Sequence, residues 1–284
     1  MSSATKASTV TTASRVHLLW CGSLLVLTVL FCSAALGSEN TAKALEIGYV
    51  EFPPFQYQDD SGRPAGSVVE LTRQVAQEAG YSVDFVSIPV GRVYLYLKNG
   101  GIDAWLGVTD VPSLAGSVIE SDASPMAVEL SAWFFDGIPA FRSLDDLRGR
   151  TVILLGGYTY GGLLEQLEKD GQVRIYEAPN HQAALQMLAK GRGDYLLDYR
   201  QPIEEILADS PIEGLRSAAV RKRNTAWVFS LKAPNPMEAR AAFDSAYLRL
   251  ALRNELPEFA RHPGALIRPR LVDSANGSQP ASAN

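Results

Sequence analysis

Hydrophobic and polar positions follow the same plan in two parts of the chain. In each part an apolar run leads into a segment with apolar residues at helical spacing, then into a glycine-rich turn and a second apolar run that begins at an aspartate. The first copy ends at residues 97–106 (LKNGGIDAWL) and the second at residues 188–197 (LAKGRGDYLL). The repeat predicts two lobes of similar α/β build, and a cleft between two lobes is where small molecules bind.

The first copy is expected to fold as an alternation of strands and helices. Val68, Leu71 and Val75 have the spacing of one helix face, and Gly80 stands where a helix C-cap is expected. Such an alternation predicts a parallel sheet covered by helices. The strands are expected at 45–50, 81–86 and 102–107, and the helices at 67–79 and 89–98.

The second copy repeats this alternation and is followed by a return to the first lobe. Two apolar stretches, 129–135 and 225–231, are expected to cross between the lobes and to form a hinge suited to closure. A long helix at 237–254 is expected to pack back on the first lobe. Within the second lobe a short helix and turn is expected at 143–150, strands at 151–155, 173–176 and 195–197, and helices at 161–169 and 181–190.

The N-terminal segment has the features of a targeting sequence. It begins polar, with Lys6 and Arg15 and no acid, and residues 18–31 are almost wholly apolar. Small residues follow up to Gly37, as at a signal-peptidase site, and this apolar run is short for a membrane span. We therefore expect residues 1–37 to be a cleaved signal peptide and the protein to be exported, with an uncleaved anchor helix as the alternative.

The expected domain organisation has a discontinuous first lobe. This lobe is expected at 38–132 and 232–272, and the second lobe with its hinge strands at 133–231. The composition of residues 273–284, rich in Ser, Ala and Asn, predicts a disordered tail.

Charge and composition exclude several classes of function. The chain carries 26 Lys and Arg against 31 Asp and Glu, a net charge of −5, and has no basic stripe, which argues against nucleic-acid binding. Both of its 2 cysteines lie in the expected signal peptide, so we expect no disulfide. His181 and His262 are isolated, and neither HExxH nor GxSxG occurs. We therefore expect no metal site, no cofactor and no enzymatic activity.

Several short motifs occur in a fixed order along the chain. They are Pro53-Pro54-Phe55-Gln56-Tyr57, Gly62 through Gly66, Glu70-Leu71, Asn99-Gly100-Gly101-Ile102-Asp103, Asp146-Leu147-Arg148-Gly149-Arg150-Thr151-Val152 and Gly191-Arg192-Gly193-Asp194. In this order and spacing the chain resembles the bacterial extracellular solute-binding proteins of family 3, the periplasmic receptors of polar amino-acid ABC importers.

This resemblance implies a fold, a location and a partner. The fold is α/β, the two-lobed periplasmic-binding-protein type II fold, in which each lobe is a mostly parallel sheet flanked by helices and two crossing strands join the lobes. The implied protein is a periplasmic monomer that captures a small polar, carboxylate-bearing solute, such as an amino acid, by lobe closure. Its implied partner is the membrane permease of an ABC importer.

Candidate ligand contacts in the first lobe lie after its first and third strands. Phe52 and Phe55 are expected to offer an aromatic face, because the resemblance implies that an aromatic side chain here stacks on the ligand. The alternative for each is that it fills the core of the lobe. Gly107 and Thr109, at the end of the third strand, are expected to present main-chain groups and a hydroxyl.

The carboxylate clamp is where the chain departs from the family. Members that bind α-amino acids carry an arginine about five or six residues beyond this threonine, which grips the carboxylate with both nitrogens. Residues 110–117 contain no basic residue here. Arg92, at the start of a predicted helix, is the candidate replacement, and a solvated helix arginine is the alternative.

A glycine-rich turn in the second lobe is the expected anion site. Gly157, Tyr158 and Thr159 lie between a strand and a helix, where free main-chain N–H groups and close approach favour an anion. The resemblance implies that this turn receives the ligand carboxylate with the help of the threonine hydroxyl. A flexible turn lined by structural tyrosines is the alternative, and a phosphate loop is disfavoured because no Gly-Lys-Ser/Thr follows.

Two aspartates of the second lobe are expected to have different roles. Asp194 heads its strand as Asp103 does in the first lobe, which predicts a structural turn-capping role for both. Asp198 lies at the C-terminal end of its strand, where ligands sit in open α/β sheets, and is the candidate acceptor for a ligand ammonium. The family's ammonium-binding aspartate corresponds to Tyr199, one residue further on, and Glu51 is the reserve candidate.

Two other classes of function stay open from the sequence. A sensor that reports to a signalling partner uses the same clamp, because the ligand stabilises the closed state in either case. A carboxylate-based lyase or dehydratase on this fold would use Glu51 or Asp198 and would turn its ligand over.

Overall fold

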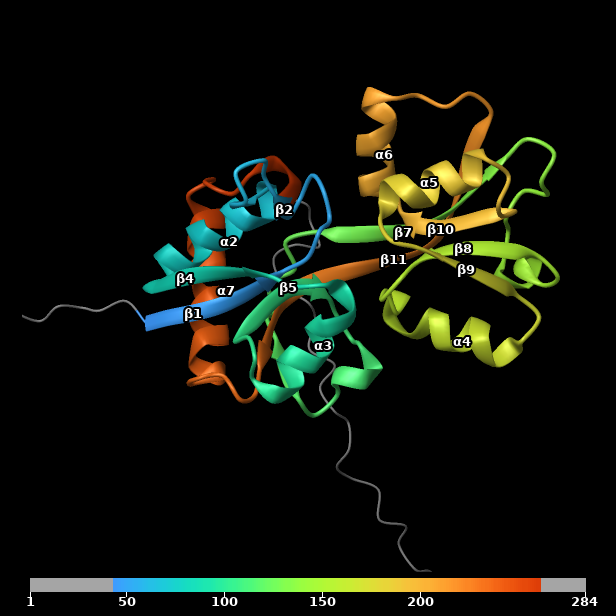
Figure 1. Ribbon diagram of the computed structural model, residues 1–284. Coiled ribbons are helices and arrows are strands. Elements are labelled where there is room, and N and C mark those ends of the chain that lie inside the picture. Colours follow the sequence, from blue (N-terminus) through green and yellow to red (C-terminus); the bar gives the residue numbers. More distant parts are fainter. Residues whose placement is uncertain (1–42, 262–284) are drawn as a thin grey trace, which may run out of the picture. The chain divides into compact units, whose positions relative to one another are not determined.

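The computed structural model describes residues 43–261, which fold around a single continuous nine-stranded sheet (Figure 1). The strand order is β4-β1-β5-β11-β7-β10-β8-β9, with a short strand, β6 (Val118–Glu120), paired to β11. The expected signal peptide at 1–37 and the expected tail at 273–284 lie outside these residues. Within residues 43–261, no helix combines the length and the apolar character needed to cross a membrane.

The first lobe is built on three parallel strands at one end of this sheet. They are β1 (Lys43–Tyr49), β4 (Tyr81–Ser87) and β5 (Ala104–Val108), with β1 in the centre. Two helices, α2 (Ser67–Glu78) and α3 (Val90–Asn99), lie on opposite sides of the strands (Figure 1). This arrangement confirms the expected strand-helix alternation, because parallel strands need crossover connections that cover both faces of the sheet.

The second lobe has the same construction at the other end of the sheet. Its parallel strands are β8 (Thr151–Leu155), β9 (Arg174–Ala178) and β10 (Tyr195–Tyr199), with β8 in the centre. In Figure 1, helix α4 (Leu163–Asp170) lies below the strands and α5 (His181–Ala189) above them. Helix α6 (Arg200–Asp209), which follows β10, was not expected from the sequence.

Two long antiparallel strands join the lobes. They are β7 (Ala127–Phe135) and β11 (Leu215–Ser230), and β11 pairs with β7 along its first half and with β5 along its second half. The crossing strands are thus confirmed, but β11 begins well before the expected 225–231. Its first half was missed because the sequence there, LRSAAVRKRN, is polar and basic and lacks the apolar run of a buried strand. The register of β11 against β7 shifts between Ala219 and Arg221.

The long C-terminal helix α7 (Pro236–Leu252) packs against the first lobe, as expected. The ring of Phe243 lies edge-on to Trp227 at 5.6 Å and to Phe229 at 5.2 Å between centroids, and it also meets Tyr81. Short elements complete the described chain: β2 (Tyr57–Gln58), β3 (Pro64–Ala65), and 3-10 turns at Pro112–Leu114, Leu144–Leu147, Tyr160–Gly162 and Glu258–Ala260.

The two glycine-rich turns of the repeat are built alike, and each is closed by its aspartate. Asp103 accepts a hydrogen bond at Oδ2 from the main-chain N–H of Glu46 (2.9 Å), and its own N–H donates to the carbonyl of Glu46 (2.8 Å). Asp194 has the same two bonds with Thr151, at 2.7 and 2.8 Å. Both aspartates therefore tie the turn to the lobe's central strand, which confirms the expected structural role.

Candidate ligand-binding site

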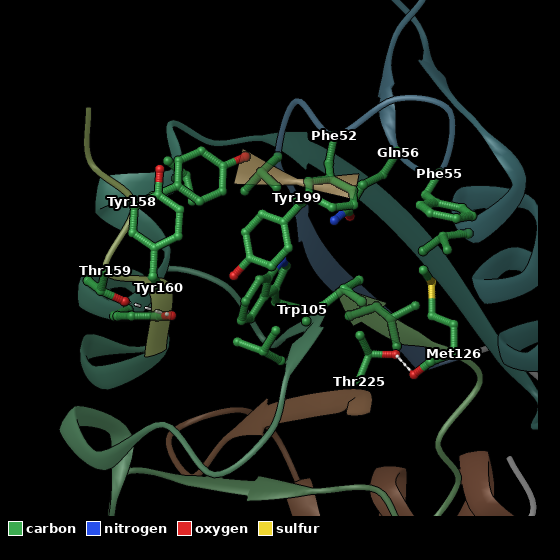
Figure 2. Close-up of a pocket in the computed structure, with 18 of the residues that line it drawn as sticks. Phe52, Phe55, Gln56, Trp105, Met126, Tyr158, Thr159, Tyr160, Tyr199 and Thr225 are labelled. Atoms are coloured by element: carbon green, nitrogen blue, oxygen red, sulfur yellow. Dashed lines mark hydrogen bonds between the residues drawn. The ribbon is translucent and has the colours of Figure 1, made fainter. Parts of the chain in front are cut away.

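A cavity of about 60 Å³ lies where the lobes and the crossing strands meet (Figure 2). Its lining comes from both lobes and from β5 and β11, and among the described residues it includes no charged side chain. Seven of the lining residues are aromatic, namely Phe52, Phe55, Tyr94, Trp105, Tyr158, Tyr160 and Tyr199. The remaining lining residues are Val50, Gln56, Val68, Val90, Leu106, Gly107, Val108, Met126, Val128, Gly157, Thr159 and Thr225.

The loop after β1 places two aromatic rings at the cavity. The rings of Phe52 and Phe55 are stacked, with 6.2 Å between centroids and 18° between planes. Phe52 also packs edge-on against Tyr199 of the second lobe, at 5.3 Å. The structure thus brings the two predicted phenylalanines together at the cavity wall, and stacking on a ligand stays a prediction.

The turn after β8 closes the cavity from the second lobe. Gly157 has φ of 82°, and Tyr158 and Thr159 follow it into the lining. The hydroxyl of Thr159 lies 3.3 Å from the hydroxyl of Tyr94, and the hydroxyl of Tyr158 donates to the carbonyl of Glu51 at 3.3 Å. These bonds join the lobes directly across the cavity.

Two glycines allow the lobes to approach so closely. A Cβ atom on Gly91 of α3 would lie 3.2 Å from the Cα atom of Gly157, which is closer than ordinary van der Waals contact. The main chains of the first and second lobes therefore meet at this point, and a side chain on either residue would hold them apart.

Strand β5 contributes an indole to the cavity. Trp105 is 6% exposed, and its Nε1 is buried without a hydrogen-bond partner. Its ring lies against Gly107, where a Cβ atom would come within 2.0 Å of the indole, so only glycine leaves room for this ring. A buried N–H without an acceptor is costly, and an acceptor atom on a ligand would satisfy it.

The tyrosines of the cavity are neutral hydrogen-bonding groups. Burial raises the pKa of Tyr94, Tyr158, Tyr160 and Tyr199 above the usual value for the phenol. Their hydroxyls therefore stay protonated at neutral pH and can donate as well as accept. The cavity offers apolar faces and neutral polar atoms.

Asp198 lies outside the cavity lining and is 0% exposed. Its Oδ2 lies 2.9 Å from Nδ1 of His181, and its Oδ1 accepts a bond from the N–H of Tyr199 at 2.7 Å. Burial raises the pKa of Asp198, while the contact with His181 acts in the opposite direction. The His181 ring in turn lies edge-on to Phe52 at 6.0 Å, so Asp198 stands behind the cavity wall. Its role as an ammonium acceptor stays a prediction.

Two other predicted contacts also lie outside the lining. Arg92 is exposed on α3. Thr109 is 3% exposed, and its hydroxyl donates to the carboxylate of Asp110 at 3.0 Å, although its neighbours Gly107 and Val108 do line the cavity. Of the predicted contacts, the cavity brings together Phe52, Phe55, Gly107, Gly157, Tyr158 and Thr159.

An outer cleft of about 440 Å³ adjoins the cavity and shares Val90, Gly157 and Tyr158 with it. Glu51, the reserve candidate, lines this cleft together with His181. Elsewhere in residues 43–261, no group of three or more His, Cys, Asp or Glu side chains is placed to hold a metal ion.

Sequence reasoning missed several of the residues that form the site. Three of them, Tyr94, Trp105 and Tyr199, lie within or at the end of helices and strands. There, the sequence spacing of an aromatic residue that lines a cavity is the same as that of one buried in the core. Arg223 of β11 reaches the edge of the cavity from far along the chain. The sequence feature that indicates Arg223 is its alternation with Arg221 and Thr225 on one face of a strand. This feature can be interpreted only once the strand itself has been predicted.

The fold is that of solved amino-acid receptors. An ancestral arginine-binding protein bound to arginine superposes with a TM-score of 0.63, at 22% identity over 75% of this chain and 94% of that chain. The GluR0 ligand-binding core with L-glutamate gives 0.62 at 19% identity, over 78% and 97%. A histidine kinase sensor domain with similarity to periplasmic binding proteins gives 0.64 at 22% identity, over 76% and 94%. At these identities the likeness shows the type II periplasmic-binding fold.

Sequence comparison agrees with the fold. The profile of "Bacterial extracellular solute-binding proteins, family 3" matches residues 45–123. The amino-acid-binding protein AabA of Dichelobacter nodosus is 22% identical over 165 residues, 57% of this chain. The arginine-binding extracellular protein ArtP of Bacillus subtilis is 29% identical over 140 residues, 49% of this chain. The alignments span 64% and 52% of the lengths of these relatives. Over residues 45–123 the chain is thus similar to the bacterial extracellular solute-binding proteins, family 3.

Proposed function

We propose that this protein is an exported receptor that captures a small carboxylate-bearing solute, an amino acid or a similar compound, by closure of its two lobes. The observation that carries the proposal is the cavity at the meeting of the lobes, because its walls come from both lobes and both crossing strands. The cross-lobe bonds of Tyr158 and Thr159 support it, since they exist only when the lobes are together. The relatives, described as amino-acid-binding and arginine-binding, support the class of solute.

The size of the site constrains how such a solute is held. A cavity of about 60 Å³ has room for a few water molecules. An amino acid therefore needs the cavity together with part of the adjoining cleft, which measures about 440 Å³. In this arrangement its side chain enters the aromatic cavity, and its polar end lies nearer to the opening between the lobes.

The affinity expected of such a receptor is within reach of these contacts. Micromolar binding corresponds to a free energy of about −8 kcal/mol. Burial of an apolar side chain among the aromatic rings contributes about 25 cal/mol per Å² of apolar area, and one charged pair adds more.

Delivery to an ABC importer is the proposed use of the captured solute, and the expected location is the periplasm. A ligand sensor for a signalling partner is the second candidate, favoured by the similarity to a histidine kinase sensor domain. Both use the same closure, because a ligand that binds the closed state shifts the population of the protein toward that state.

The test is thermal unfolding of the purified protein against amino acids, small carboxylates, amines and short peptides. Binding to the native state raises the melting temperature by mass action. A rise of several degrees with an amino acid or a carboxylate supports the receptor. Loss of the compound during incubation would instead indicate an enzyme, and a panel without any rise would remove the proposal.

A further inference from the structure

The cavity face of β11 carries two arginines next to a lining residue. Side chains alternate along a strand, so Arg221, Arg223 and Thr225 point to one face of β11. Thr225 lines the cavity, and Val128, the β7 residue opposite Arg223, lines it too. Lys222 points to the other face, where its Nζ lies 3.2 Å from the carboxylate of Glu129.

The guanidinium of Arg223 lies where the two lobes meet at the edge of the cavity. Its Nη1 donates to the carbonyl of Gly161 in the second lobe at 3.2 Å. Its Nη2 donates to the carbonyl of Asp110 at 3.0 Å and to that of Thr109, both in the first lobe. The residues just before these contacts, Val108 in the first lobe and Tyr160 in the second, line the cavity.

Neither guanidinium is neutralised by an acidic side chain of residues 43–261. Arg223 donates to three main-chain carbonyls, so two of its five N–H donors are unused. Arg221 is half-buried and makes no hydrogen bond or ion pair within residues 43–261, so all five of its donors are unused.

The electrostatics of this corner favour an anion. Burial, and the neighbouring charge of Arg223, lower the pKa of Arg221, while the phenol of Tyr199 acts in the opposite direction. Arginine nevertheless stays protonated in proteins, so two like charges lie side by side in a half-buried place. A carboxylate between them would offset both the repulsion and the lost hydration.

We propose that Arg221 and Arg223 form the anion-binding part of the ligand site, so that the carboxylate of the solute is held from the crossing strand β11. This inference rests on the proposed function. It gives Arg221 and Arg223 the carboxylate-binding role of the arginine that is absent after β5. Arg92 is exposed on α3, whereas Arg221 and Arg223 are half-buried on the same strand face as the lining residue Thr225.

The same geometry sets the class of solute. The aromatic cavity is neutral and takes an apolar or aromatic side chain. The two arginines beside the cavity repel a solute whose side chain is positively charged, because like charges at short range are unfavourable. The solute is therefore a monocarboxylate with an uncharged apolar body, such as an apolar α-amino acid or its deaminated analogue, in preference to arginine or lysine.

The experiment compares carboxylates with their amides, in which a neutral group replaces the carboxylate, by isothermal titration. The probes are L-phenylalanine and L-phenylalaninamide, L-leucine and L-leucinamide, 3-phenylpropionate and 3-phenylpropionamide, and L-arginine. The variants are Arg221→Met, Arg223→Met and, as the matched control on the opposite face of the same strand, Lys222→Met. The melting temperature of each variant without ligand is measured first.

We expect a carboxylate to bind the wild-type protein at least tenfold more tightly than its amide, and L-arginine to bind more weakly than L-phenylalanine. Each arginine variant should lose about tenfold in carboxylate affinity with little change for the amide, and Lys222→Met should lose nothing. Arg221→Met is the decisive variant, because Arg221 makes no hydrogen bond to the described residues whose loss would disturb the fold.

Other outcomes overturn the inference in distinguishable ways. The inference is wrong if a carboxylate and its amide bind equally, or if the arginine variants lose affinity equally for both. The arginines would then not bind the carboxylate, and the proposed receptor function would still stand. If 3-phenylpropionate binds through the arginines and no amino acid binds, the inference is supported. The solute in the proposed function is then a carboxylate without an amine and not an amino acid. A panel in which nothing binds removes both.

Discussion

The carboxylate of Asp198 is bound to His181 and to the main-chain N–H of Tyr199, and Asp198 itself does not line the cavity. His181 is 5% exposed and lies edge-on to Phe52 and Tyr158, both of which line the cavity. A buried carboxylate that orients a buried imidazole in this way supports the aromatic wall from behind. At the scale of the residue, a substitution in the Asp198–His181 pair can distinguish a role in stability from a role in ligand binding.

Replacing Asp198 with Ala should destabilise the protein by about 1–3 kcal/mol, because it leaves the imidazole of His181 buried without its partner. Thermal unfolding without ligand measures this loss. Binding of L-phenylalanine and of 3-phenylpropionate, which differ in the ammonium group, should change by the same factor. A loss of tenfold or more for the amino acid alone would instead make Asp198 the ammonium acceptor that the sequence predicts.

At the scale of the element, the same turn, closed by an aspartate, occurs at the equivalent position in both lobes. Asp103 and Asp194 each close a glycine-rich turn onto the central strand of the lobe, and the helices before them are followed by glycines with positive φ, Gly100 at 80° and Gly191 at 65°. Since the bonds match in type and length, the two aspartates should contribute similar free energies.

The variants Asp103→Ala and Asp194→Ala should each lower the free energy of unfolding by about 1–3 kcal/mol, because each leaves a main-chain N–H of a strand without its charged acceptor. Urea titration measures both. Asp84→Ala, an exposed position on β4, is the control and should lie within about 0.5 kcal/mol of the wild type. A large loss for one lobe and none for the other would contradict the equivalence.

Helix α7 is held to α2 by a cluster of charges around Glu78. Its carboxylate accepts hydrogen bonds from Arg249 at 2.6 Å and from Arg253 at 2.8 Å. Hydrogen bonds from Arg253 and Arg249 lower the pKa of Glu78 from 4.5 to about 2. A lowered pKa in the folded state means stabilisation that is complete above pH 4.5 and is lost as the pH falls toward 2.

Replacing Glu78 with Gln should therefore lower the melting temperature at pH 7, and the difference from the wild type should shrink as the pH falls from 4.5 to 2. Melting curves across this range measure it. Glu70→Gln is the matched control, because Glu70 is on the same helix and its ion pair is with Arg73, one turn away. A difference that stays constant with pH would exclude the charge of Glu78 as its cause.

At the scale of the whole molecule, closure depends on how near the two main chains come at Gly91 and Gly157. Replacing Gly91 with Val should keep the lobes apart, because even a Cβ atom there would lie 3.2 Å from Gly157. We expect a larger radius of gyration by solution X-ray scattering and at least a tenfold loss of affinity for the solute. Lys98→Val, in the last turn of α3, should change neither, and a compact Gly91→Val protein would show that the lobes close without this contact.

Much of the fold could be predicted because its strands are short apolar runs next to amphipathic helices. Strand β8 lies where the sequence predicts it, and β1, β4 and β10 differ by a few residues. Helix α6 could not be predicted in this way, since its short sequence RQPIEEILAD contains a proline and buries few residues.

Apart from Gly107 of β5, the cavity residues that could be predicted lie on loops. Phe55 and Gly157 lie beside a proline and a glycine that mark turns, and binding residues are expected on turns. Tyr94 and Trp105 are aromatic residues within regular elements, where burial in a core and exposure to a cavity give the same pattern. Arg223 meets Gly161 and Thr109 through contacts of long sequence separation, which a local pattern does not contain.

The unpartnered indole of Trp105 gives the protein an optical signal of its own. Of the tryptophans in residues 43–261, Trp133 and Trp227 already donate hydrogen bonds, to Asp198 and Thr72, and Trp105 is the one that faces the cavity. A solute that accepts a hydrogen bond from this indole should shift its fluorescence emission to longer wavelength, and Trp105→Phe should abolish the shift. Occupancy of the site can then be followed in real time in a purified sample, without a dye or a label.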